Sequence, residues 1–178
     1  MNFILMLMVL AGAAVQAGAQ GPVFDEYQLK AAYLYNFAKF VEWPPGTFAK
    51  SNDSISICII GQNPFGSELE DMVRGNKIGE RAVAVRMLPD TQQAGKCHIV
   101  FIGATESKRT SALLESLKGG GILTVGDTED FTALGGIIRF RLDGTHLHIQ
   151  IALETAERSK IRISSRLLSL AEIVTRRP

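Results

Sequence analysis

The chain has 178 residues, of which 46% are hydrophobic and 21% are charged, so it is long enough for one domain with a substantial core. Its 19 Lys and Arg residues nearly balance 18 Asp and Glu residues, giving a formal net charge of +1. This balance argues against a nucleic-acid-binding protein, because such proteins carry a strong positive charge.

The first residues are typical of a secretory leader. Residues 3–14 are mostly apolar, and the small residues Ala17-Gly18-Ala19 that follow fit a signal-peptidase site. The apolar run is too short to span a bilayer. We predict a signal peptide over residues 1–19, export across the inner membrane to the periplasm, and a mature domain over residues 20–178. An uncleaved anchor is the alternative, because no Lys or Arg precedes the apolar run.

Residues 24–41 are predicted to form a helix, since apolar side chains recur at steps of three and four residues. Trp43 and Pro44 end it, because proline cannot continue a helix. We expect Trp43 to cover the core below the helix end. The alternative is an aromatic side chain on a binding surface.

Strands and helices then alternate along the chain. The expected strands are residues 55–60, 81–87, 97–102 and 122–125, and the expected helices are residues 64–73, with Asn63 as N-cap, and 105–117. This alternation predicts a single α/β domain with a mixed, mainly parallel, Rossmann-like sheet flanked by helices.

Two of these strands, residues 55–60 and 97–102, each end before a glycine and each carry one of the two cysteines, Cys58 and Cys97. We expect the two strands to lie close together in the core, so that the cysteines can meet. In an oxidising compartment they would form a disulfide. The alternative is a pair of buried free thiols.

Motifs for catalysis or cofactor binding are absent. The glycine spacing at residues 61–66 fits a P-loop, but Ser67-Glu68 replaces the Lys-Ser/Thr that would meet phosphate. Asp127 follows a buried strand, where α/β proteins place functional groups, yet it also suits the start of a helical turn. We favour the capping role over a ligand site or a hydrolase centre, and predict no enzyme activity, cofactor or metal.

Residues 136–142 and 145–153 are predicted to form an antiparallel hairpin around Asp143-Gly144. The expected register places apolar residues on one face by pairing Leu142 with Thr145, Phe140 with Leu147, and Ile138 with Ile149. The other face would set Arg139 opposite His148 and Arg141 opposite His146.

The polar face of this hairpin is cationic, with two arginines and two histidines. Arginines would repel a metal ion, so we do not expect the histidines to bind one. A flat basic patch suits contact with an acidic protein surface, and histidine protonation would make that contact pH-sensitive. Beyond the hairpin, residues 161–163 are expected to be extended, and Ser164 to cap a final helix over residues 165–174.

Three segments together resemble a known family, the YfiR-like periplasmic proteins. They are the opening K-x-A-x-x-x-N-F-x-x-F-x-x-W-P pattern at residues 30–44, the LTV-x-D…F…GG-x-I pattern at residues 123–138, and the R-I-S-S-x-L-L-x-L-A segment at residues 162–171. The resemblance covers nearly all of residues 20–174.

The resemblance implies a non-catalytic α/β domain, often dimeric. Such a protein represses an inner-membrane diguanylate cyclase by binding its periplasmic domain, which lowers cyclic di-GMP and biofilm formation. An outer-membrane, peptidoglycan-associated lipoprotein relieves the repression. Cys58 and Cys97 match one disulfide of the family, whereas a second family disulfide has no counterpart here, and Ala152 replaces a usual Asn.

On this resemblance we predict a regulatory binding protein whose partner-binding residues lie on the C-terminal hairpin and its flanks: Arg139, Arg141, His146, His148, Phe131 and Ile163. A small-molecule sensor subunit of another membrane signalling system is the alternative function.

Overall fold

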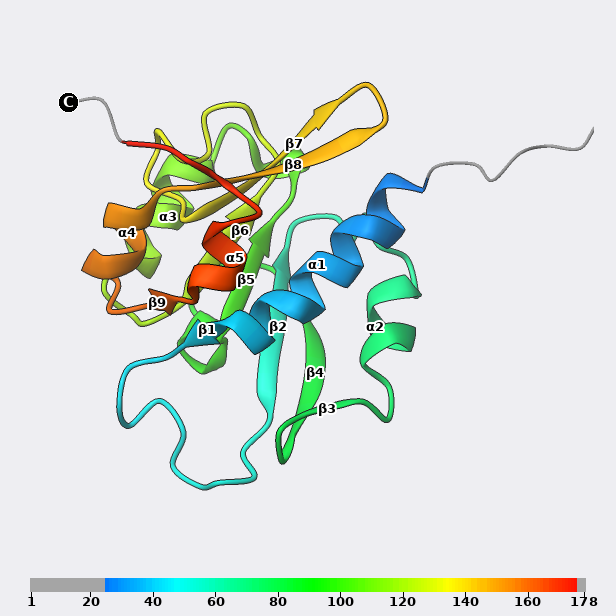
Figure 1. Ribbon diagram of the computed structural model, residues 1–178, viewed down its shortest axis with the longest axis vertical. Helices are drawn as coiled ribbons and strands as arrows, with labels where there is room; N and C mark the ends of the chain where they lie inside the picture. The colour runs from blue at the N-terminus through cyan, green and yellow to red at the C-terminus, as the bar shows by residue number, and fades with distance from the viewer. Residues whose placement is uncertain (1–24, 176–178) are drawn as a thin grey trace, which may run out of the picture.

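An eight-stranded sheet runs through residues 25–175, the part of the chain that this computed structural model describes (Figure 1). The strand order is β10-β8-β7-β6-β5-β2-β4-β3, and a separate two-stranded sheet pairs β1 with β9. The predicted signal peptide lies outside the described residues. The helices are α1 (Glu26–Phe40), α2 (Glu68–Val73), α3 (Thr110–Leu117), α4 (Leu153–Arg158) and α5 (Ser165–Leu168). The strands are β1 (Val41–Glu42), β2 (Ile55–Ile60), β3 (Lys77–Ile78), β4 (Arg81–Leu88), β5 (Ile99–Ile102), β6 (Leu123–Gly126), β7 (Ile138–Asp143), β8 (His146–Ile151), β9 (Arg162–Ile163) and β10 (Glu172–Ile173).

The centre of the sheet is parallel. Strand β2 lies between β4 and β5, and β6 and β7 continue the parallel order beyond β5. Nearly every side chain of β2, β5 and β6 is buried, as expected for parallel strands covered on both faces. The predicted α/β fold and the adjacency of the two cysteine-bearing segments are therefore confirmed.

The two faces of the sheet have separate cores, because successive side chains of a strand point to opposite sides. Ile57 and Ile59 pack with α1, α2 and α5 on one face. Cys58 and Ile60 pack with α3 on the other face. Figure 1 shows α1 lying across the first of these faces.

Helix α1 closely matches its prediction, and its start is set by a residue just before it. The Oδ1 atom of Asp25 accepts hydrogen bonds from the backbone N–H groups of Tyr27 and Gln28, both at 3.1 Å. The next helix begins later than expected, at Glu68. Asn63 instead holds a turn, in which its side chain accepts from the N–H of Phe65 and donates to the carbonyl of Gly66. Helix α3 also begins later, at Thr110, after a short 3-10 turn at residues 104–106.

The C-terminal hairpin is present, but its predicted register is wrong. Phe140 pairs with Ile149 and Arg141 with His148, so each β8 partner lies two residues further along than expected. The reason is the turn, in which the two central residues are Gly144 and Thr145 rather than Asp143 and Gly144. Gly144 has φ +58°, which fits the first central position of a tight hairpin turn. A shift of two residues keeps each side chain on its predicted face.

The final helix is much shorter than predicted. Ser164 caps it, with Oγ accepting from the N–H of Leu167, but α5 ends at Leu168 instead of continuing to residue 174. The chain then forms β10 beside β8, and the N–H of Val174 donates to the carbonyl of Ile151 at 2.9 Å. Pairing with the open edge of β8 replaces the hydrogen bonds that a longer helix would have made.

Candidate functional site

The hairpin of β7 and β8 projects from the sheet as a two-stranded ribbon (Figure 1). Strand β6 pairs with β7 only as far as Arg139, and β10 pairs with β8 only at Gln150 and Ile151. Residues 140–149, which we call the hairpin arm, therefore have no neighbouring strand on either side among the described residues. Their backbone edges are open to contact.

The orientation of the arm is set by aromatic packing against α1. The ring of Phe140 is fully buried, stacks on Phe37 at 5.7 Å and lies 6.2 Å from the ring of Tyr33. Since the side chains of a strand alternate, this contact turns the opposite face of the arm toward solvent. That face carries the predicted arginines and histidines.

We call Arg139, Arg141, His146 and His148 the basic face, and the structure places all four on one side of the hairpin. His146 and His148 are exposed, and Arg141 pairs with Asp143 at 3.5 Å. Arg139 is held differently. Its guanidinium donates to Gln150 at 3.0 Å, and Gln150 donates to Glu172 at 2.9 Å, so these side chains link β7, β8 and β10. The residues available to a partner are therefore those of the arm itself.

Two other predicted contact residues lie elsewhere. Phe131 is fully buried between Gly126 and Gly136, where an added Cβ would lie 2.3 Å and 2.1 Å from its ring atoms. It has no exposed surface to offer, so its assignment to the contact surface is corrected to a core role. Ile163 lies in β9, paired with Val41, well away from the hairpin (Figure 1).

Asp127 belongs to a buried ion pair at the carboxyl end of β6. Its Oδ2 atom accepts from the ammonium of Lys30 at 2.8 Å and from the hydroxyl of Tyr27 at 3.4 Å. The side chains of Lys30 and Asp127 are only 3% and 7% exposed, and Glu26 contacts the same ammonium at 2.5 Å. Residues 128–135 form bends and turns rather than a helix, so the predicted capping role is wrong, and the carboxylate instead ties α1 to the sheet.

These contacts shift the pKa values of Lys30 and Tyr27. Burial alone would lower the pKa of Lys30, but hydrogen bonds to Asp127 and Glu26 outweigh it and raise the pKa above its usual value. Burial, followed by the negative charge of Asp127, raises the pKa of the Tyr27 hydroxyl. Lys30 is therefore a charged anchor and a poor proton acceptor, which does not suit it to general-base catalysis.

The carboxyl ends of β2 and β5, where open α/β sheets usually bind ligands, are closed by the chain itself. Gly61 has φ +93°, and a Cβ there would lie 2.8 Å from both Thr105 and Glu106. The N–H of Gln62 donates to the hydroxyl of Thr105 at 3.3 Å. Among residues 25–175, no group of three or more His, Cys, Asp or Glu side chains is placed to hold a metal ion.

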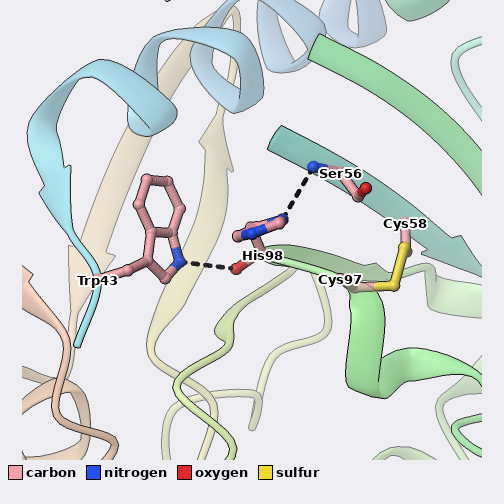
Figure 2. The surroundings of a disulfide bond; sticks show 5 residues. All are labelled: Trp43, Ser56, Cys58, Cys97 and His98. Atoms are coloured by element: carbon pink, nitrogen blue, oxygen red, sulfur yellow. Dashed lines mark hydrogen bonds between the residues drawn. A yellow bond between two sulfur atoms is a disulfide. The ribbon is translucent and has the colours of Figure 1, made fainter. Parts of the chain in front are cut away.

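At the other end of the sheet, Cys58 and Cys97 form a disulfide with a Cα–Cα distance of 5.9 Å (Figure 2). Beside it, Nδ1 of His98 accepts from the N–H of Ser56 at 3.0 Å, and Trp43 donates to the carbonyl of His98 at 3.3 Å. The prediction that Trp43 covers the core is confirmed, since it is partly buried against the core of the α1 face.

His98 is also enclosed by aromatic and charged groups. Its ring stacks on the ring of Phe48, with the two ring centres 4.5 Å apart, and the guanidinium of Arg81 lies 3.7 Å from the centre of the Phe48 ring. Burial, and then the positive charge of Arg81, lower the pKa of His98. Sequence reasoning missed both this histidine and Lys30. The signal for Lys30 was a lysine among the apolar positions of a helix; for His98, it was a histidine inside an apolar strand.

The family model described as YfiR/HmsC-like matches residues 27–172. The chain belongs to the YfiR/HmsC-like family. This family comprises periplasmic regulators of cyclic di-GMP signalling that act through a partner membrane protein and are regulatory rather than catalytic. Within residues 25–175, no helix has the length and apolar character needed to cross a membrane.

Solved structures share the fold of this YfiR/HmsC-like chain. They include a conserved domain protein from Vibrio cholerae and an ABC domain from Streptococcus pneumoniae in complex with L-Trp. Each has a TM-score of 0.54 and 10% sequence identity, with 83% of this chain and 60% of the other chain covered. The chain thus spans about 60% of the length of each of these proteins, and the likeness concerns the fold alone.

Proposed function

We propose that this protein binds the periplasmic domain of an inner-membrane diguanylate cyclase and holds the cyclase inactive, lowering cyclic di-GMP output and biofilm formation. The observation that carries the proposal is the hairpin arm, a ribbon fixed on α1 by Phe140 with its basic face turned outward. A projecting basic ribbon suits an acidic surface on a partner.

Repression by binding requires differential affinity. A protein that bound the active and inactive cyclase equally well would shift no equilibrium, however tightly it bound. The arm provides a means of discrimination, since a ribbon with open edges requires a matching groove or strand on the partner. We expect such a groove to be formed only in the inactive cyclase.

The arm by itself is small for a stable interface, which typically buries about 800 Å² on each partner. Exposed apolar side chains extend it on the β10 side: Leu170 and Ile173 are 66% and 46% exposed, and β10 borders β8. Leu142 adds a 41% exposed side chain near the tip. We infer that the contact surface is the arm together with β10, with a second copy of this chain and the outer-membrane lipoprotein as further partners.

The proposal is tested by reversing charge on the arm while leaving the packed face intact. The variant Arg141→Glu with His148→Glu should bind the cyclase periplasmic domain at least tenfold more weakly. It should also raise cyclic di-GMP in cells. Lys108→Glu, an exposed charge change near α3, is the matched control and should leave both unchanged. Full repression by the folded double variant would rule out the arm as the contact.

A further inference from the structure

A cleft of about 420 Å³ lies between α3, α4 and the face of β6 that looks away from α1. The strand itself is covered on this face, and Thr124 is only 5% exposed. Phe131 fills the space over Gly126, whereas Thr124, two residues earlier, lines the cleft. The cleft reaches the sheet at Thr124, and its volume is in the range of small-molecule sites.

The two walls of the cleft differ in character. Leu114, Leu117 and Ile122 form an apolar wall that belongs to the core of the α3 face. Thr155 and Ser159 of the opposite wall are polar. A ligand that fits both walls has an apolar body and a polar end.

The charged residues that line the cleft are both basic. Lys118 and Arg158 line it, and none of the described residues lining it is acidic. Arg158 is positioned by a hydrogen bond from its guanidinium to the hydroxyl of Thr155 at 3.1 Å. Its ion pair with Glu154 is long, at 4.0 Å, and both side chains are more than half exposed. Lys118 pairs with Glu115, which is also exposed. Exposed pairs of this kind are weak and are readily exchanged for another anion.

We propose that this cleft binds a small amphipathic anion, with a hydrocarbon or aromatic body against Leu114, Leu117 and Ile122 and a carboxylate between Lys118 and Arg158. Two cations without a lining acid favour an anion over a cation of equal size. The apolar wall excludes a fully polar anion, because such a ligand would lose its hydration along that wall. The site is separate from the basic face and independent of the proposed cyclase contact.

Titration calorimetry of the purified full chain with decanoate tests the site. We expect saturable binding of one decanoate per chain, tighter than butanoate by up to about fourfold for each added methylene. Decylamine, which has the same body and the opposite charge, should not bind. 3-Phenylpropanoate separates the two sources of such an anion: a tighter decanoate complex indicates a lipid-derived ligand, and a tighter phenylpropanoate complex indicates an aromatic acid.

Substitutions of the residues that line the cleft test whether decanoate binds there. Lys118→Glu and Arg158→Glu should each weaken decanoate binding about tenfold, whereas Lys108→Glu, an exposed residue that does not line the cleft, should leave it unchanged. Ser159→Trp should block the cleft to all the acids. Equal binding of decylamine and decanoate, unchanged affinity in both charge variants, or the absence of saturable binding would each overturn the proposal.

Discussion

Lys30 and Asp127 are 97 residues apart in the chain, and their side chains meet in the buried interior at 2.8 Å. The contact joins the first helix to the carboxyl end of β6, next to the strand that begins the hairpin. The same ammonium lies 4.5 Å from the centre of the Tyr27 ring. The position of the hairpin arm on α1 therefore rests on a charged contact as well as on the stacking of Phe140 with Phe37.

Removing one partner of this pair should be costly. Lys30→Met leaves the Asp127 carboxylate buried without its cation, and should lower the free energy of unfolding by about 3–5 kcal/mol. Lys30→Met with Asp127→Leu should recover much of that loss, because no buried charge remains. Urea unfolding of the two variants and the wild type measures the difference. A loss below about 1 kcal/mol in the single variant would mean that the pair is not buried in solution.

His98 should make stability depend on pH. Its pKa is lowered in the folded protein, so the unfolded chain binds a proton more readily. The stabilisation is complete above the usual histidine pKa of about 6.5 and is lost as the pH falls through the lower folded value. The urea midpoint should therefore drop between neutral and acidic pH. His98→Asn retains an acceptor for the Ser56 N–H without titrating, and should show a smaller drop; equal pH dependence in both proteins would contradict this assignment.

The disulfide should contribute to stability through the 39-residue separation of its cysteines. In the chain-entropy treatment, a closed loop of this length is worth about 4 kcal/mol. Cys58→Ala with Cys97→Ala should lower the free energy of unfolding by roughly that amount, as should reduction of the wild type. The reductant should have no effect on the double variant. A reductant effect of similar size in both proteins would show that it acts elsewhere.

Phe131 should be sensitive to any side chain added beside it. Gly136→Ala places a Cβ 2.1 Å from the ring, and Gly126→Ala places one at 2.3 Å, so each should destabilise the fold by about 1–3 kcal/mol. Thermal unfolding would measure both. Combining Gly136→Ala with Phe131→Leu should cost less than the sum of the separate changes, because the smaller side chain relieves the overlap. Strict additivity of the two changes would contradict direct contact.

In the hairpin, the alternation of apolar and polar residues predicts the face of each side chain but not the pairing register. Alternation placed Phe140 on the packed face and Arg141 on the open face, and both assignments hold because a strand has a period of two. The same pattern is satisfied by any register shifted by two residues. The choice of Gly144 and Thr145 as the turn centre, which sets the true pairing, depends on backbone twist between the paired strands.

The short apolar runs, the cysteine positions and the family motifs by themselves determined the α/β class, the adjacency of β2 and β5, and the family of this protein. Only the tertiary structure decided the partners of Asp127, the end of α5 and the α3–α4 cleft. Each of these depends on groups distant in the chain: a lysine 97 residues away, the open edge of β8, and two helices facing one strand. Local patterns record which side chains avoid water, whereas long-range packing decides which buried groups meet.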